Sequence, residues 1–137
     1  MRSVLIIDDE PNIRRMVGAL LGAEGYDVRD ASDGSSGVMR AGENEPDVVL
    51  LDLMMPGDMD GMGTLERLRE RRVDSPVVMI SGHGNIETAV RATKLGAFDF
   101  IEKPLSIEKT VLTVRNALRQ QRLELINAGM AAALAKE

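Results

Sequence analysis

Five short apolar runs, spread over the first hundred residues, constrain the fold of this 137-residue chain most strongly. Three of them are nearly continuous and rich in β-branched side chains, which is typical of strands buried on both faces of a parallel sheet. The second run is the weakest. We predict strands at Val4–Ile7, Val28–Ala31, Val48–Leu51, Val77–Ile80 and Phe98–Ile101.

Segments with helical periodicity separate these runs. Apolar residues recur at spacings of three and four, and glycines at 25 and 96 mark helix ends. The predicted helices are Ile13–Leu21, a weaker one at Gly37–Ala41, Met62–Arg69, Ile86–Leu95, and a last helix that opens at Ser106 as its N-cap. Alternating strands and helices predict an α/β fold, a doubly wound (βα)5 parallel sheet with helices on both faces.

The chain length fits one domain with a short extension. We expect the domain to occupy residues 1–121 and a helical extension or linker to occupy residues 122–137. The extension is rich in Ala, Leu, Glu and Gln, with Gly129 as its only break. Leu123, Ile126 and Met130 form one apolar line, and Val111, Val114, Leu118 and Leu125 form another. An apolar face that the sheet cannot cover predicts a homodimer through the last helix, with a frayed tail as the alternative.

Composition excludes several classes of protein. There is no cysteine, so the chain has neither a disulfide nor a thiolate metal site. The formal net charge of -5 disfavours direct binding to nucleic acid. No stretch approaches the ~20 apolar residues of a membrane span, and the apolar run after Met1 is too short for a signal peptide. We therefore expect a cytoplasmic protein.

Polar residues follow four of the five predicted strands. In open α/β sheets, ligands bind outside the carboxyl ends of the strands, so these residues should meet at one edge. They are Asp8, Asp9 and Glu10 after the first strand, Asp52 after the third, Ser81 after the fourth and Lys103 after the fifth.

This set has a coherent chemistry. Clustered carboxylates repel one another, and a hard divalent cation with oxygen ligands resolves the conflict. Asp52 would then be a nucleophile that forms an aspartyl-phosphate. Lys103 would pair with the phosphoryl group, and Ser81 would donate a hydrogen bond to it.

Each residue also has an ordinary interpretation. Asp9 and Glu10 before Pro11 could complement a helix dipole, and Asp52 could form a turn. Ser81 could be a loop hydroxyl and Lys103 a solvated cation. The ordered combination of these residues favours the functional interpretation over four coincidences.

Four stretches, VLIIDDEP, VVLLDLMMP, VVMISGHG and FDFIEKP, resemble in order and spacing the signatures of response-regulator receiver domains of two-component systems. The resemblance covers Met1 to about Arg119. It implies the flavodoxin-like strand order 2-1-3-4-5 and a phosphorylation switch served by a sensor histidine kinase. It also implies that the chain catalyses only its own phosphorylation and dephosphorylation and is otherwise not an enzyme.

Carried over by position, the resemblance implies a site for Mg2+ or Mn2+ and a phosphoacceptor. Its metal ligands are Asp8, Asp9, Asp52 and the Met54 backbone carbonyl. Asp52 is the phosphoacceptor, Lys103 pairs with the phosphoryl group, Ser81 and Phe100 are switch residues, and the Lys103–Pro104 bond is cis.

The stretch MISGHGNIETAV, followed by GAFDFIEKP, is most similar to receivers of the NtrC/NtrX class of sigma-54-dependent regulators. That implies AAA+ and DNA-binding effector domains beyond these residues, which contain no P-loop of their own. The segment Gly57–Asp60 is one residue longer than the family pattern, so we expect a bulge there. His83 is either a solvated loop residue or a modulator of phosphoryl lifetime. The methionines at 54, 55, 59 and 62 could form a soft partner-binding surface, but ordinary packing is the preferred interpretation.

Three other functions are alternatives to a phosphorylation switch. A haloacid-dehalogenase-type phosphatase would need a second Asp where Met54 stands. A flavin or nucleotide binder would need a phosphate loop where Asp8, Asp9 and Glu10 would repel phosphate. A degenerate receiver is disfavoured by the intact set of acid, hydroxyl and lysine.

Overall fold

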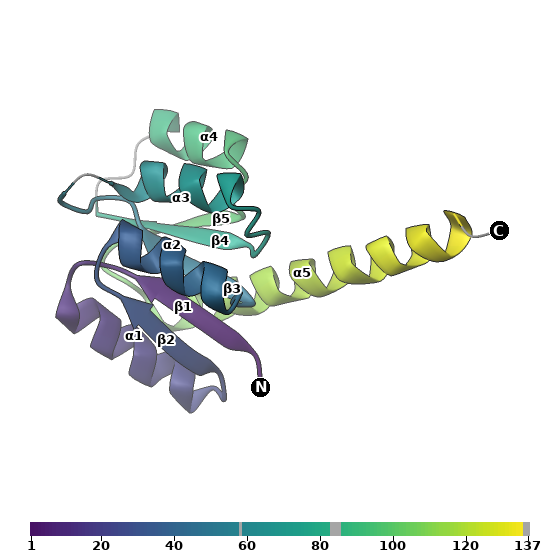
Figure 1. Ribbon diagram of the computed structural model, residues 1–137. Helices are drawn as coiled ribbons and strands as arrows, with labels where there is room; N and C mark the ends of the chain where they lie inside the picture. The colour runs from purple at the N-terminus through teal and green to yellow at the C-terminus, as the bar shows by residue number, and fades with distance from the viewer. Residues whose placement is uncertain (58, 83–85, 136–137) are drawn as a thin grey trace.

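The computed structural model describes residues 1–57, 59–82 and 86–135, with side chains for all of these except 86 and 130–135. Within them, five strands alternate with five helices (Figure 1). The strands are β1 (Ser3–Ile7), β2 (Asp27–Ala31), β3 (Val48–Asp52), β4 (Val77–Ser81) and β5 (Asp99–Glu102). The helices are α1 (Pro11–Ala23), α2 (Gly34–Glu43), α3 (Gly61–Glu70), α4 (Ile86–Lys94) and α5 (Ile107–Ala135).

The sheet is parallel throughout, with the order β2-β1-β3-β4-β5. The predicted fold and strand order are therefore confirmed. The bounds of all five strands differ from the prediction by one residue. Strands β1 and β2 start one residue earlier, at Ser3 and Asp27, and β5 is shifted to Asp99–Glu102. Strands β3 and β4 end one residue later, at Asp52 and Ser81. Asp52 and Ser81 are therefore part of the sheet itself, at the edge where the predicted site lies.

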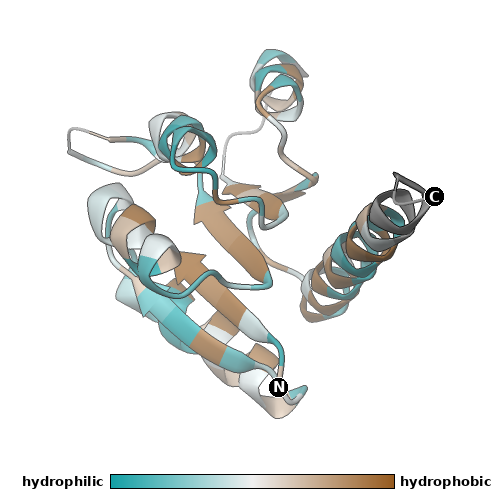
Figure 2. Ribbon diagram, turned by 45° about the vertical axis from the view of Figure 1, so that its right-hand side comes forward, coloured by the Kyte–Doolittle hydropathy of each residue, from teal (hydrophilic) through white to brown (hydrophobic). Residues whose placement is uncertain are grey.

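Two apolar layers sandwich the sheet, one on each face. Because side chains alternate along a strand, Leu5 and Ile7 pack with the α2 and α3 side while Val4 and Ile6 pack with the α1 and α5 side. All four are completely buried. Figure 2 shows hydrophobic residues concentrated in the central strands, whereas β2 at the edge of the sheet is mostly hydrophilic.

Side-chain caps define several helix starts. Asp33 accepts from the Ser36 backbone N–H at 2.7 Å and Asp60 accepts from the Gly63 N–H at 2.8 Å, so each satisfies an unpaired donor in a first turn. The cap at Asp33 begins α2 three residues earlier than the apolar spacing predicts. The predicted cap at Ser106 is present, with its hydroxyl accepting from the Lys109 N–H at 3.3 Å.

Helix α5 is one continuous helix that packs on the sheet and then runs well past it (Figure 1). Val114 and Leu118 are buried against the sheet, so the expectation that their apolar line stays uncovered is wrong for these two residues. Exposed apolar side chains occur near the start of α5, at Ile107 and Leu112, and again beyond the sheet at Leu123, Leu125 and Ile126. None of the described helices is long and apolar enough to cross a membrane.

Gly61, the first residue of α3, holds this helix against the strand that ends in Asp52. Its N–H donates to the Leu53 carbonyl at 3.0 Å. A Cβ here would collide with the Asp52 carbonyl oxygen and the Leu53 Cα, which are backbone atoms and cannot rotate away.

We predict that Gly61→Ala lowers the free energy of unfolding by about 1–3 kcal/mol, because the helix start must move off the strand. The matched control is Gly42→Ala within α2, where an added Cβ meets nothing within 4 Å. That control should raise stability by about 0.5–1 kcal/mol through helix propensity. Urea unfolding followed by circular dichroism measures both, and equal effects would refute the close-approach argument.

Candidate functional site

Neighbouring strands bring three carboxylates to one edge of the sheet. Asp8 follows β1, and Asp52 ends β3, which is paired with β1. Asp8, Asp9 and Asp52 each offer a carboxylate oxygen, and these oxygens lie within 4.8 Å of one another. Asp8 is 0% exposed and Asp52 is 1% exposed, so two of the three charges are withheld from water.

The protein's own hydrogen bonds satisfy only part of this acid cluster. The Glu10 N–H donates to Asp8 Oδ1 at 2.8 Å, and the Met54 N–H donates to Asp52 Oδ1 at 3.3 Å. Among the described residues, Asp8 Oδ2 and Asp9 Oδ1 are buried without a hydrogen-bond partner. Buried polar atoms normally have partners, so these oxygens fit the ligand set of a hard cation.

Lys103 supplies the one ammonium group that reaches the described part of the cluster. Its Nζ lies 3.7 Å from Asp52 Oδ1, 3.8 Å from Asp8 Oδ2 and 3.4 Å from Glu10 Oε1. Burial lowers the pKa of Lys103, but the charges of Asp8, Asp52 and Glu10 outweigh it and raise that pKa overall. The following bond to Pro104 is cis, as predicted.

The single positive charge of Lys103 does not offset the negative charge of the clustered acids. Burial, followed by the charge of Asp8, raises the pKa of Asp52 to about 7, even though Lys103 opposes the shift. Burial also raises the pKa of Asp8, with the Glu10 N–H and Lys103 opposing. The site thus holds negative charge that a divalent cation would stabilise.

Ser81 lies beside this edge, and Phe100 lies farther back along the sheet. The register pairs Asp52 with Ile80, so Ser81 is one residue beyond on the neighbouring strand. Ser81 is buried, and its carbonyl accepts from the Lys103 N–H at 2.8 Å. Phe100 pairs with Met79 and is half-buried against the apolar layer beneath α4, which includes Ala92.

The remaining predicted residues lie mainly in the segment between β3 and α3. The Met54 side chain is exposed, whereas Met55 and Met62 are buried and Met59 is partly buried, which supports ordinary packing for most of this segment. Gly57 has a φ of 102°, a bend that favours glycine. The role considered for His83 lies outside the described residues, as does Asp58 of the lengthened segment.

Arg14 is a supporting residue that the sequence did not reveal. Its guanidinium donates to the Asp8 carbonyl at 2.8 Å and lies 3.4 Å from Asp30. It fixes the backbone that presents the acids. An arginine that binds a backbone carbonyl has no signature in residue spacing, so only the fold could identify it.

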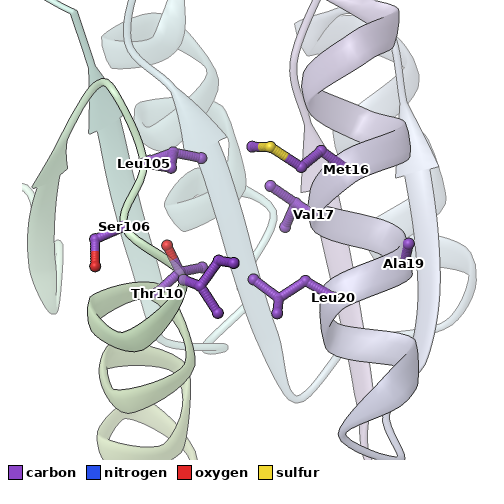
Figure 3. Close-up of a pocket in the computed structure, with 8 residues that line it drawn as sticks. Met16, Val17, Ala19, Leu20, Leu105, Ser106 and Thr110 are labelled. Carbon is purple, nitrogen blue, oxygen red and sulfur yellow. The ribbon is translucent and has the colours of Figure 1, made fainter.

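An apolar groove of about 350 Å3 lies beside the site, between α1 and the start of α5 (Figure 3). Met16, Val17 and Leu20 face Leu105 and Thr110 across it. No titratable side chain lines this groove, and it begins only two residues after Lys103. The groove therefore offers no ionisable group, in contrast to the acid edge.

The sequence profile described as the response regulator receiver domain matches residues 4–115. The chain belongs to this family. Among its relatives, the nitrogen assimilation regulatory protein NtrX of Azorhizobium caulinodans is 43% identical over 121 residues, which is 88% of this chain and 27% of that protein. The regulatory protein AtoC of Escherichia coli is 36% identical, over 88% of this chain and 26% of its own length.

Solved structures agree with this assignment. NtrX from Brucella abortus superimposes with a TM-score of 0.88 and 39% identity, covering 95% of this chain and 30% of that one. The isolated receiver domain of the same protein gives a TM-score of 0.80 and 42% identity, covering 85% of this chain and 98% of that one. The chain is thus a receiver domain of the NtrC class that spans about a quarter of the two curated relatives.

The crowding of the acids predicts a pH-dependent stability in metal-free solution. Burial and the charge of Asp8 raise the pKa of Asp52 to about 7 in the folded domain, from an ordinary value of 3.8. The contribution of Asp52 to folding therefore becomes more unfavourable as the pH rises from about 4 to about 7.

We predict that Asp52→Asn is more stable than the wild type at pH 8 in EDTA, by on the order of 2 kcal/mol, and that the advantage shrinks toward pH 4. Urea unfolding at several pH values measures it. Glu43→Gln, an exposed change of equal charge on α2, serves as the control and should show no such trend. A destabilised Asn variant at pH 8 would contradict the role of charge crowding.

Proposed function

We propose that this receiver domain is a phosphorylation-dependent signalling switch that accepts a phosphoryl group on Asp52 from a sensor histidine kinase. The observation that carries the proposal is the buried Asp52 carboxylate, 3.7 Å from Lys103 and within 4.8 Å of two further acids. This arrangement supports a carboxylate nucleophile next to a cation site. Receiver domains in general work with histidine kinases.

In the proposed reaction, an Asp52 oxygen attacks the phosphorus of a phosphohistidine. The new P–O bond forms while the P–N bond breaks, and the histidine leaves with the electron pair. Mg2+ held by Asp8, Asp9, Asp52 and the Met54 carbonyl would neutralise charge on the phosphoryl oxygens. Lys103, now close to Asp52, would then pair with a phosphoryl oxygen as a point charge.

The domain would act on no substrate but itself. Its chemistry would be limited to its own phosphorylation and the later hydrolysis of the aspartyl-phosphate. Met54 stands where a haloacid-dehalogenase-type phosphatase would carry a second Asp, so the enzyme alternative lacks its general acid.

Ser81 and Phe100 would convert phosphorylation into a change of surface. The Ser81 hydroxyl would donate to a phosphoryl oxygen, which would draw the end of β4 inward, and Phe100 would turn into the space left beneath α4. Both residues lie on neighbouring strands with Lys103 next to Ser81, which supports this coupling. The change is a population shift between two states.

The output would be control of transcription. Relatives such as NtrX and AtoC are named as regulatory proteins, and this chain matches about a quarter of each. We propose that residues 1–121 form the switch and that residues 122–137 connect it to AAA+ and DNA-binding effector domains in the cytoplasm.

We predict that a small phosphodonor such as acetyl phosphate, with Mg2+, adds one phosphoryl mass to the chain. Asp52→Asn should abolish the addition, and Asp9→Ala should slow it at least tenfold by weakening the metal site. Intact-mass spectrometry measures all three, with Glu43→Gln as the unaffected control. Full labelling of the Asn variant would place the phosphoacceptor elsewhere.

We also propose that two copies associate through α5 and its extension. Leu123, Leu125 and Ile126 are 50%, 65% and 47% exposed beyond the sheet, and a second copy would bury them. Phosphorylation would strengthen or rearrange this dimer.

The dimer predicts a loss of association in Leu123→Gln/Ile126→Gln. Sedimentation velocity of the full chain, with and without a phosphoryl analogue, should show dimers for the wild type and monomers for the variant. Met39→Gln, a 60% exposed side chain on α2, is the control and should remain dimeric. A monomeric wild type at high concentration under both conditions would rule the dimer out.

A further inference from the structure

Four arginines gather around one hollow at the end of the sheet opposite the acids. The hollow has a volume of about 330 Å3. Arg2 precedes β1, whereas the acid cluster follows that strand, so the two sites lie at opposite ends of it. The lining residues are Arg2, Tyr26, Arg115, Leu118, Arg119 and Arg122.

Three distant segments of the chain build this hollow. Arg115, Arg119 and Arg122 are spaced by four and three residues, which places them on one face of α5. Arg2 joins them from the start of the sheet, where its guanidinium donates to the Leu118 carbonyl at 3.3 Å. The hollow therefore depends on the tertiary fold, since helix spacing alone accounts for only three of the arginines.

Among the residues that the structure describes, no carboxylate lines this hollow. In the part of the chain that the structure describes, none of the four arginines forms an ion pair, whereas Arg14 and Arg67 each have a carboxylate partner. Two acids lie nearby and neither lines the hollow. Asp47 accepts hydrogen bonds from Ser3 and Gln121, and the Asp27 N–H donates to the Arg2 carbonyl at 2.8 Å. Four cations thus stand together in a chain whose net charge is -5.

We propose that this hollow binds an anionic phosphate chain, either a free oligophosphate or the phosphates of a nucleotide. Guanidinium groups match phosphate oxygens with paired, charge-assisted hydrogen bonds, and several of them suit several phosphoryl groups. An anion would also relieve the mutual repulsion of the arginines. The volume lies at the lower end of the range for small-molecule sites, and Tyr26 offers an aromatic ring for stacking.

An anion bound in this hollow would link α5 to the start of β1, and so hold the beginning of the α5 extension against the domain. Arg2 directly precedes β1, while Arg119 and Arg122 belong to α5, the helix that runs past the sheet (Figure 1). This site does not use Asp52 or the metal ligands, so the proposal stands apart from the phosphorylation switch.

The test is isothermal titration of the full chain in EDTA at low ionic strength with inorganic triphosphate, ATP and adenosine. Triphosphate should bind with a one-to-one stoichiometry. Arg115→Gln/Arg119→Gln should weaken it at least tenfold. The matched control, Arg15→Gln/Arg91→Gln, removes the same charge from exposed positions on α1 and α4 and should leave the affinity within twofold of the wild type.

The probes also separate the two sources of the phosphate chain. ATP that binds more tightly than triphosphate, with the advantage lost in Tyr26→Leu, supports a nucleotide. Equal affinities support a free oligophosphate. Backbone amide shifts in the wild type should map triphosphate to residues 2, 26 and 115–122, which tests the site even if a variant fails to fold.

The proposal would be overturned if neither triphosphate nor ATP bound at millimolar concentration. It would also be overturned if both pairs of arginine substitutions weakened triphosphate binding equally, or if the amide shifts were centred outside the hollow. Binding of a DNA duplex without binding of triphosphate would also overturn it, in favour of a nucleic-acid surface.

Discussion

Asp8 and Asp52 lie at the ends of paired strands, and the Lys103 ammonium lies within 4 Å of both carboxylates. The charge balance and the stability of this edge of the sheet depend on that contact. The acids are buried by the same sheet that brings them together, so their mutual repulsion cannot be relieved by solvent. A single ammonium leaves the pKa of Asp52 near 7. The site is therefore built at a cost in stability, and a divalent cation or a change in charge at Asp52 alters the energy of the whole edge.

The surrounding fold restrains this unfavourable arrangement. Gly61 lets α3 touch the backbone of Asp52 and Leu53, and Arg14 holds the Asp8 carbonyl. Two buried layers of mainly aliphatic side chains fix the strands from both faces. Strain at the acid edge is thus offset by packing elsewhere, which is common for functional sites.

Much of this could be predicted from sequence because the strands are buried on both faces and appear as continuous apolar runs. The convergence of Asp8, Asp52 and Lys103 then follows from parallel topology. The burial of Val114 and Leu118 could not be predicted, because helix periodicity does not say which face meets the sheet. The arginine hollow needs the long-range contact between Arg2 and α5, which local spacing does not contain.

The most direct measurement of the central claim is the linkage between Mg2+ and stability. Urea unfolding at pH 8 should show the wild-type free energy of unfolding rising with Mg2+ concentration, since the folded acid cluster binds the ion and the unfolded chain does not. Asp9→Asn and Asp52→Asn should lose most of that increase, while Glu43→Gln should keep it. If Mg2+ stabilised both Asn variants as much as it stabilises the wild type, these acids would not hold the cation and the account would be contradicted.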